Sequence, residues 1–380
     1  ISDMENALFK GHTEIKSVII PEGYEVISRE AFKDCTSLER VEIASSVTYI
    51  STYAFEGCTA LKEVVFNEGL TGIAAYAFDG CTALGDITLP SSTVAVGAYA
   101  FRNTSMDGAT FICKGNAVFD TWALAESGFK TVQFLGNCDL SIDAVMAYAK
   151  VENLTIGEGT EVLGSNFAST DFGETTPLTV SLPESLKEIG DGAFSQREGL
   201  TEIDLKNVEV IGEDAFSYTG LRELLIPGTV KEVGAAFDSC IQLKTIRVSE
   251  GVEAIGDEAF SFAGSGNGSE GEYVTYLTDE AYEKNKAYVY QEDEKAGFVN
   301  VYLPSTLKRV GANVFYGAYV DGIYMEWCTS PDALPSFDPT FVEDKLAGIH
   351  QIYFTKETID AYGDELDAYF MNTNAKDCCW

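Results

Sequence analysis

Apolar residues recur along the chain as triplets at positions x, x+3 and x+5, as in Leu38, Val41 and Ile43. The last two members flank a single residue, which is the period of a strand with one buried face. The triplet occurs fourteen times, mostly at steps of 21 to 23 residues, with exceptions of 26, 29 and 55. The other copies are Ile15/Val18/Ile20, Leu61/Val64/Phe66, Leu84/Ile87/Leu89, Met106/Ala109/Phe111, Phe129/Val132/Phe134, Val151/Leu154/Ile156, Pro177/Val180/Leu182, Leu200/Ile203/Leu205, Leu221/Leu224/Ile226, Leu243/Ile246/Val248, Phe298/Val301/Leu303, Val320/Ile323/Met325 and Ile349/Ile352/Phe354.

A second repeated signature is the pair Ala-Phe. Four copies lie 23 residues apart, from Ala31-Phe32 to Ala100-Phe101, and four more run from Ala193-Phe194 to Ala259-Phe260. Val314-Phe315 is a weaker copy. We expect this pair to fill the core from behind the strand.

A unit of about 23 residues is too short to bury its own apolar face, so the copies must stack. Stacking places each strand beside its copy in the next turn, about 4.8 Å away, in a parallel ladder. The sequence therefore predicts a solenoid of about fourteen right-handed turns with a parallel sheet on one face. We expect the solenoid over residues 1–325, and the last turn with a C-terminal cap over residues 326–380, ending in a strand and a helix.

The full repeat is best preserved from Ile87-Thr88-Leu89-Pro90 through Gly97 to Phe101, and again from Leu224 to Cys240. This pattern resembles the BspA-like leucine-rich repeats of bacterial surface proteins, and the resemblance covers almost the whole chain. It implies a leucine-rich-repeat solenoid in the α/β repeat class that serves as a binding scaffold. It is specific for the fold and not for one function.

Two regions break the period. Residues 102–170 lose the Ala-Phe pair, and short helical pieces at Thr121 to Ser127 and Ile142 to Ala149 are expected to replace it. Residues 261–297 form an acidic insertion that opens with a glycine-rich run, and two stretches, Tyr273–Leu277 and Ala287–Gln291, are candidates for a hairpin. The insertion is either a recognition element or an inert loop. Its candidate binding residues are Tyr273, Tyr276, Tyr288 and Tyr290.

The residue types needed for catalysis are scarce. His12 and His350 are the only two histidines, and neither has a nearby Cys or Glu pattern. His12 occupies the position that Cys35 fills one turn later, three residues after the repeated Phe. We therefore expect no enzyme, cofactor or metal site.

The nine cysteines divide into repeat positions and scattered ones. We expect the repeat cysteines to be packed core residues and not disulfides. They are Cys35, Cys58, Cys81 and Cys240. Cys113, Cys138 and Cys328 show no obvious pairing by spacing.

Charge narrows the choice of partner. The formal net charge of −35 argues against nucleic acid and anionic lipid, both of which need clustered Lys and Arg. No run approaches the roughly 18 apolar residues of a membrane span. We expect an extracellular or cell-surface protein whose signal or anchor segment, upstream of Ile1, has been removed.

The residue between x+3 and x+5 projects from the solvent side of each strand. Down the fourteen turns this column reads Ile19, Glu42, Val65, Thr88, Thr110, Gln133, Thr155, Ser181, Asp204, Leu225, Arg247, Tyr302, Tyr324 and Tyr353. The last three are tyrosines whose rings should stack, with Arg247 before them, and they predict an amphipathic binding patch. We expect a non-catalytic binding protein for adhesion or protein recognition on a host or bacterial surface. The alternative is a glycan-binding or spacer module. Exposed coplanar rings edged by carboxylates would favour sugar, and a broad mixed patch would favour protein.

Overall fold

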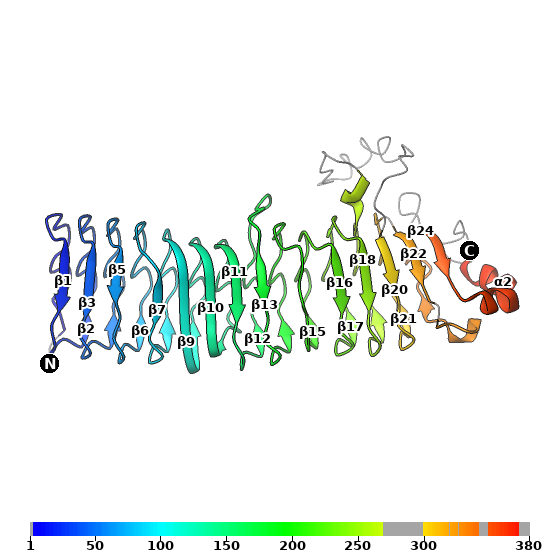
Figure 1. The fold of residues 1–380 in the computed structure, drawn as a ribbon, viewed down its shortest axis with the longest axis horizontal. Coiled ribbons are helices and arrows are strands. Elements are labelled where there is room, and N and C mark those ends of the chain that lie inside the picture. Colours follow the sequence, from blue (N-terminus) through cyan, green and yellow to red (C-terminus); the bar gives the residue numbers. More distant parts are fainter. Residues whose placement is uncertain (1–2, 269–298, 319, 326, 342–348, 372–380) are drawn as a thin grey trace. The chain divides into compact units, whose positions relative to one another are not determined.

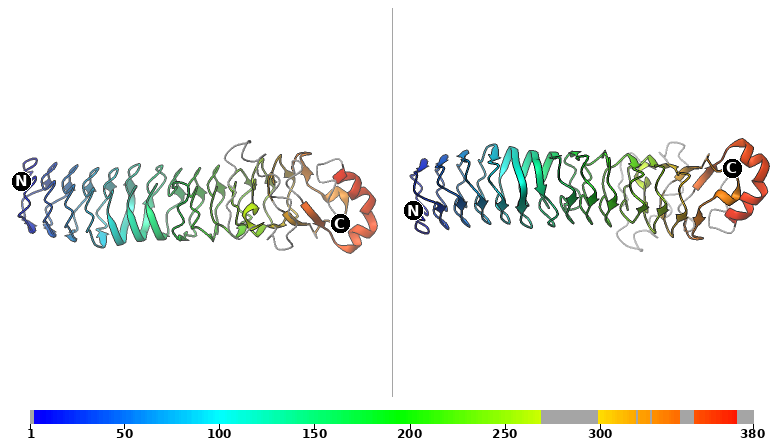
Figure 2. Two further views of the ribbon diagram at one scale, coloured as in Figure 1. Left: turned by 90° about the horizontal axis from the view of Figure 1, so that it is seen from above. Right: turned by 90° about the horizontal axis from the view of Figure 1, so that it is seen from below.

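The computed structural model describes residues 3–268, 299–318, 320–325, 327–341 and 349–371. The chain forms two compact units, Ile1–Gly199 and Leu200–Trp380, and each is described by itself. Strands in both units run in parallel ladders, as Figures 1 and 2 show.

The parallel strands of unit 1 lie in two columns, and one long strand joins parts of both into a nine-stranded sheet. The strands of the first column follow the triplets, so that Val18 lies beside Val41 and Val41 beside Val64. Its strands are β1 (Ser17–Ile20), β3 (Arg40–Ile43), β5 (Glu63–Val65), β7 (Ile87–Leu89), β9 (Ser105–Phe119), β10 (Gly128–Asp139), β11 (Lys150–Ile156) and β13 (Thr179–Ser181). The narrow strands on the return path are β2 (Val26–Ile27), β4 (Tyr49–Ile50), β6 (Gly72–Ile73), β8 (Ala95–Val96), β12 (Val162–Leu163) and β14 (Glu188–Ile189).

Unit 2 repeats this arrangement and ends in a helix. Its main sheet has the order β16-β18-β20-β22-β24, formed by Glu223–Ile226, Thr245–Val248, Val299–Tyr302, Val320–Tyr324 and Ile349–Tyr353. The return strands are β15 (Val210–Ile211), β17 (Glu232–Val233), β19 (Ala254–Ile255), β21 (Arg309–Val310) and β23 (Ser336–Phe337). Short 3-10 turns span η1 (Ser265–Gly268) and η2 (Pro331–Ala333), and the helix is α2 (Lys356–Met371).

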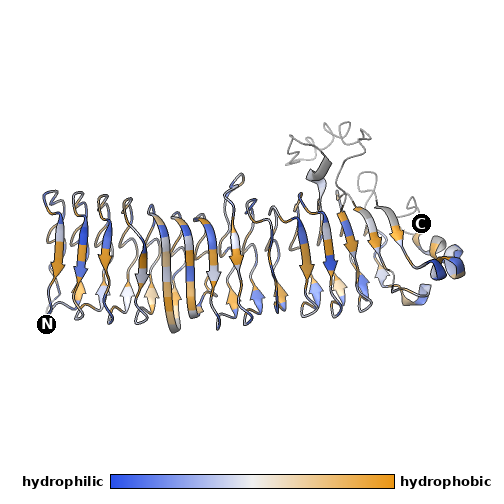
Figure 3. Ribbon diagram, viewed as in Figure 1, coloured by the Kyte–Doolittle hydropathy of each residue, from blue (hydrophilic) through white to orange (hydrophobic). Residues whose placement is uncertain are grey.

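Most residues of the predicted triplets lie in the core, and apolar residues recur along the strands (Figure 3). Strand β16 shows the alternation, with Leu224 and Ile226 buried and Glu223 and Leu225 exposed. Pro177 is a wrong member of its triplet, because it is exposed and the next residue, Leu178, is buried. The solenoid class is confirmed. The count of fourteen turns is approximate, because Leu200/Ile203/Leu205 lies in the described chain without a strand.

The repeated Phe fills the core from the return side. In unit 1 the Phe rings stack from Phe9 to Phe101 with centroids 5.2 to 5.4 Å apart. In unit 2 a second stack runs from Phe216 through Phe237 and Phe260. The spacing of the rings is close to the spacing of neighbouring strands, so one aromatic per turn yields a continuous buried stack.

The two short helices expected at Thr121–Ser127 and Ile142–Ala149 are wrong. Both segments are turns, in which Trp122 has a φ of 62° and Tyr148 a φ of 60°. A right-handed helix requires negative φ at each residue, so these positions interrupt it. The same left-handed residue precedes the Ala-Phe pair in other turns, which means that the repeat continues here with different side chains.

The closing segment matches the expected last strand and helix, β24 and α2. Leu366 and Phe370 of α2 are buried, and the Phe370 ring lies 5.6 Å from that of Phe337 in β23. The division of the chain at residue 325 stays a prediction, and the Tyr273–Leu277 and Ala287–Gln291 hairpin lies outside the described residues.

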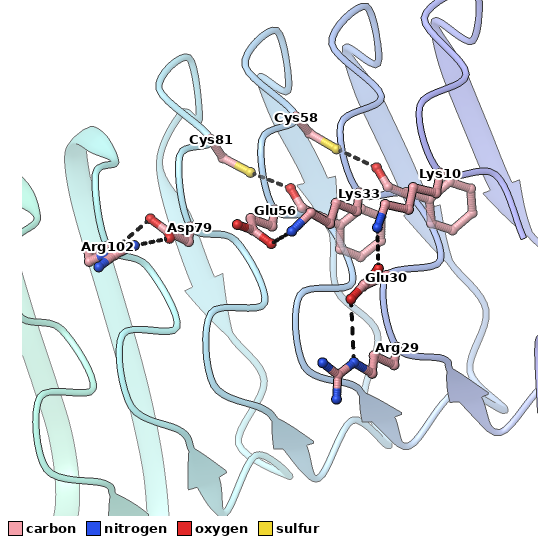
Figure 4. A network of polar contacts seen from close by, with 11 residues as sticks. Lys10, Arg29, Glu30, Lys33, Glu56, Cys58, Asp79, Cys81 and Arg102 are labelled. Carbon is pink, nitrogen blue, oxygen red and sulfur yellow. Dashed lines mark hydrogen bonds and ion pairs between the residues drawn. The ribbon is translucent and has the colours of Figure 1, made fainter. Parts of the chain in front are cut away.

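The repeat cysteines are free thiols within the core, as expected. The Sγ atoms of Cys58 and Cys81 donate to the carbonyl oxygens of Phe32 and Phe55, at 3.1 and 3.2 Å (Figure 4). Each thiol thereby supplies a donor to a backbone carbonyl of the preceding turn. Burial raises the pKa of Cys58 to about 12.

Cys113 and Cys138 form a disulfide between β9 and β10, with Cα atoms 5.2 Å apart. The sequence shows no obvious pairing for these two residues, and the structure supplies it. Their separation of 25 residues differs from the repeat, and the register of the two strands shifts between Gly136 and Cys138. Spacing alone therefore did not reveal that they are neighbours.

The Cys58 thiol should resist alkylation in the folded protein. The thiolate is the reactive form, and a pKa of about 12 leaves almost none of it at pH 8. We expect iodoacetamide to modify Cys58 only after denaturation, as measured by peptide mass spectrometry. Rapid modification of Cys58 in the native protein would contradict the buried column.

Candidate functional site

A single outward row crosses the main sheet of unit 2. Strand pairing places Leu225 beside Arg247, Arg247 beside Tyr302, Tyr302 beside Tyr324, and Tyr324 beside Tyr353. Residues on either side in each strand point inward, and Ile246, Val301 and Ile323 are buried. The five side chains therefore share the solvent face, and we call them the Tyr–Arg row.

The three tyrosine rings of the row are stacked face to face. Ring centroids of Tyr302 and Tyr324 lie 4.5 Å apart at 13°, and those of Tyr324 and Tyr353 lie 4.4 Å apart at 5°. Strands about 4.8 Å apart place equivalent side chains at this distance. The faces between the rings are covered by the stack, so the row presents ring edges and hydroxyl groups.

Gly322 makes room for the stack. A methyl group on its Cα would lie 2.6 Å from Cε2 of Tyr353 and 3.0 Å from Cε2 of Tyr324. Any larger residue at this place in β22 would push the rings aside. The ring positions thus depend on a small residue in the strand beneath them.

Arg247 covers the other face of Tyr302. Its guanidinium carbon lies 4.0 Å from the ring centroid, which is a cation–π contact. Leu225 is 56% exposed and extends the row with an apolar side chain. The Tyr324 hydroxyl donates to Oδ1 of Asn300, at 3.2 Å, and this bond fixes the ring within the row.

The sequence correctly brought Tyr302, Tyr324, Tyr353 and Arg247 to one surface. Whether this surface binds a partner stays a prediction. The other candidates, Tyr273, Tyr276, Tyr288 and Tyr290, lie outside the described residues.

Sequence reasoning missed a second aromatic stack, in unit 1. Tyr53, Tyr76, Tyr99 and Trp122 stack in consecutive turns with centroids 5.2 to 5.5 Å apart. We call these four residues the aromatic ladder. The signal was present, because the three tyrosines directly precede the repeated Ala-Phe pair.

Charged side chains beside the aromatic ladder pair with one another from turn to turn. Lys33 binds Glu56, and Arg102 binds Asp79 through two nitrogens (Figure 4). The Arg102 guanidinium also lies over Tyr76 and Tyr99, 5.1 and 5.4 Å from their centroids. Lys33 and Arg102 are therefore paired with carboxylates of neighbouring turns, and these two side chains do not form a basic patch.

Within the described ranges, no group of three His, Cys, Asp or Glu side chains is placed to hold a metal ion. Among the described helices, none is long and apolar enough to cross a bilayer.

Comparison with known families fits this geometry. The model of the BspA type leucine-rich repeat region matches residues 2–130 and 165–289, in 6 copies. These two stretches make up more than half of the chain. The chain belongs to the BspA-type leucine-rich repeat family. No curated protein matches the sequence.

Solved structures of several leucine-rich repeat proteins are similar to this family member. One from Bacteroides ovatus is 20% identical, with a TM-score of 0.49, over 89% of this chain and 87% of its own. The pneumococcal vaccine antigen PcpA is 17% identical, with a TM-score of 0.40, over 97% and 90%. A leucine-rich cell surface protein from Faecalibacterium prausnitzii is 18% identical, with a TM-score of 0.36, over 95% and 85%.

BspA-type repeats are typically non-enzymatic, and the family indicates a surface protein-binding role.

Proposed function

We propose that this protein recognises a protein partner outside the cell through the Tyr–Arg row, as an adhesion or recognition molecule. The observation that carries the proposal is the continuous outward row of Leu225, Arg247, Tyr302, Tyr324 and Tyr353, ordered by stacking. Tyr and Arg are the residue types that dominate the energetics of protein interfaces. Stacking holds these side chains in place before binding, which lowers the entropy lost on association.

The geometry of the rings favours protein over sugar at this site. A sugar that stacks on tyrosine needs an open ring face, whereas here each inner face contacts the next ring or Arg247. Ring edges, hydroxyls, a guanidinium and the exposed Leu225 make a mixed surface instead. Such a surface suits the apolar and polar groups of a protein.

Two observations support a location outside the cell. Membership of the BspA-type family indicates a surface or extracellular protein. The disulfide between Cys113 and Cys138 is of a kind that persists in oxidising surroundings and is rare in the cytosol. The partner is therefore sought among host or bacterial surface proteins.

The Tyr-rich insertion belongs to the same proposal. It leads directly into β20, the strand that ends at Tyr302. Tyr273, Tyr276, Tyr288 and Tyr290 are proposed to add contacts to a partner that rests on the row.

The test is binding of the purified chain to an array of extracellular-matrix and cell-surface proteins. Changing Tyr302, Tyr324 and Tyr353 together to Ala should weaken binding about 100-fold or more, because hot-spot residues contribute about 2 kcal/mol or more each. Gly322→Ala keeps all five side chains but displaces the rings, so it should also weaken binding. Affinities are measured by surface plasmon resonance, and folding by circular dichroism.

A matched control changes the same outward column in unit 1, with Thr88, Thr110 and Thr155 replaced by Ala, and it should bind like the wild type. Unchanged binding of the triple Tyr variant would refute the row as the site. Binding to glycans alone, lost in that variant, would instead favour the alternative of a glycan-binding module.

A further inference from the structure

Three positively charged side chains lie without a carboxylate partner at one end of the main sheet of unit 2. Arg222 and Lys244 come directly before β16 and β18, and Arg247 lies on the outward face of β18. All three are exposed, and within the described ranges none of them forms an ion pair. Acidic residues outnumber basic ones in this chain, 60 to 25, so a cation without a carboxylate partner calls for an explanation. We call these three side chains the cation group.

The corresponding positions of unit 1 hold ion pairs instead. In each turn this position directly follows the first residue of the apolar triplet. Lys62 and Glu39 occupy it in neighbouring turns, and Nζ of the lysine lies 3.0 Å from Oε2 of the glutamate. Lys130 and Asp107 occupy it in another pair of turns, with Nζ 2.6 Å from Oδ1. Each of these lysines is thus balanced by a carboxylate one turn away.

Arg222 and Lys244 place two like charges in neighbouring turns at the same position. The Lys244 amide donates to the Arg222 carbonyl, at 2.8 Å, so the two residues are neighbours in the stack. The Arg222 amide in turn donates to the carbonyl of Thr201, a neutral residue at this position of the turn before. Like charges on neighbouring strands destabilise a sheet. The fold therefore gains nothing from this arrangement, whereas a negatively charged ligand would be attracted by both side chains.

Arg247 adds hydrogen-bond donors to the same surface. Its guanidinium carbon lies 4.0 Å from the ring centroid of Tyr302, and this contact restrains the side chain. A guanidinium has five N–H donors, and among the described residues those of Arg247 meet no acceptor. Lys244 lies three residues earlier, about 10 Å along the strand. A guanidinium with free donors matches a carboxylate, which it binds through two parallel hydrogen bonds.

Carboxylates border the cation group on one side. Glu202 and Asp204 are exposed in the turn before β16, and Glu223 is exposed at the start of β16. In the other direction the Tyr–Arg row continues over its three tyrosines, which are neutral at pH 7. An anionic segment that crosses the strands is therefore attracted at the cation group and repelled beyond it. Its acidic part belongs at the cation group, and its uncharged part belongs on the tyrosines.

We propose that the partner segment that rests on the Tyr–Arg row is acidic, and that its carboxylates bind the cation group. This inference rests on the proposed function, because it names the chemistry of the partner at the same surface. One Asp or Glu side chain of the partner accepts from the Arg247 guanidinium, and further ones lie near Arg222 and Lys244. Leu225 and the tyrosine hydroxyls contact the uncharged part. Complementary charge of this kind speeds association and weakens as salt rises.

The experiment selects random peptides on the immobilised protein by phage display. A segment that crosses the five strands from β16 to β24 spans about 20 Å, or about six extended residues, so peptides of about ten residues are long enough. We expect the enriched peptides to be more acidic than the starting library. Their affinity, measured by fluorescence anisotropy, should fall several-fold when the salt concentration rises from about 0.05 to about 0.3 M.

Changing the three residues of the cation group together to Gln should weaken binding of these peptides about tenfold or more, since hydrogen bonds to charged groups are the stronger ones. The matched control removes the same number of charges from ion-paired positions of unit 1, by changing Arg40, Lys62 and Lys130 together to Gln. It should bind the peptides like the wild type. Circular dichroism checks that both variants are folded.

Enrichment of neutral or basic peptides would overturn the inference, as would unchanged binding of acidic peptides to the cation-group variant or no enrichment at all. In those cases, loss of the protein partner from the array in the variant of Tyr302, Tyr324 and Tyr353 would still support the proposed function, which separates the two failures. Binding of sulfated glycans through the cation group, without enrichment of acidic peptides, would overturn the inference in favour of an anionic glycan.

Discussion

Replacing Phe55 with Ala is expected to destabilise unit 1 by about 3–5 kcal/mol, the usual cost of removing a buried aromatic side chain. Phe55 is fully buried and stacks on Phe32 at 5.3 Å and on Phe78 at 5.2 Å. The variant loses the burial of one ring and two ring contacts at once. Each turn contacts mainly its neighbours, so the damage should be confined to the turns around residue 55. Denaturant unfolding and hydrogen exchange of residues 32–78 measure the cost and its extent.

Tyr53→Ala is the matched control for that experiment. Tyr53 lies in the same turn as Phe55 and stacks on Tyr76 of the next turn, 5.2 Å away, but its side chain is half-buried. If burial dominates, Tyr53→Ala costs clearly less than Phe55→Ala. Equal costs would mean that ring stacking, and not burial of apolar area, holds the turns together. An effect of Phe55→Ala that spreads evenly over unit 1 would contradict a sum over neighbouring turns.

Much of the fold was predictable because the same apolar triplet, which must be buried, recurs many times along the chain. One triplet such as Leu38, Val41 and Ile43 is ambiguous, whereas fourteen copies at nearly constant spacing leave stacking as the way to bury them. The insertion before β20 does not disturb this logic, since Arg247 still pairs with Tyr302. The row of outward residues followed from the same register.

Features that depend on backbone conformation were not predictable from the repeat. Trp122 and Tyr148 adopt left-handed conformations that nothing in their side chains requires, and so the expected helices were wrong. The disulfide of Cys113 and Cys138 depends on a shift of register inside β9 and β10. The column of turn residues that holds Tyr53 and Trp122 lies outside the strand triplet, so the strand pattern alone does not indicate it.

Arg197 is a buried arginine at a position of the repeat where other turns have a cysteine. It lies three residues after Phe194, at the column position of the packed cysteines, and is 2% exposed. Its Nη2 donates to the carbonyl oxygen of Ala149, at 2.7 Å, and its Nε donates to that of Ala168. A cysteine donates to one carbonyl in the preceding turn, whereas this guanidinium reaches carbonyls in two. Burial lowers the pKa of Arg197 to about 10, and Glu174 opposes that shift, so the group is charged at pH 7.

Arg197→Met should therefore destabilise unit 1 by about 2–5 kcal/mol, although replacement of buried ions by apolar side chains is often neutral. In this protein the substitution also removes the side-chain donor of two carbonyl oxygens, those of Ala149 and Ala168, which costs about 1–3 kcal/mol for each. Removing the desolvated charge of Arg197 offsets only part of this cost. Arg197→Cys restores the usual residue of the column but cannot reach Ala149, so it should be only partly stable. Arg222→Met, at an exposed arginine, is the control and should change stability by less than about 0.5 kcal/mol. Denaturant unfolding gives the free energies, and faster hydrogen exchange near residues 149 and 168 would locate the loss. Full stability of Arg197→Met would show that the apolar side chain compensates, and that the arginine is not needed to hold the three turns together.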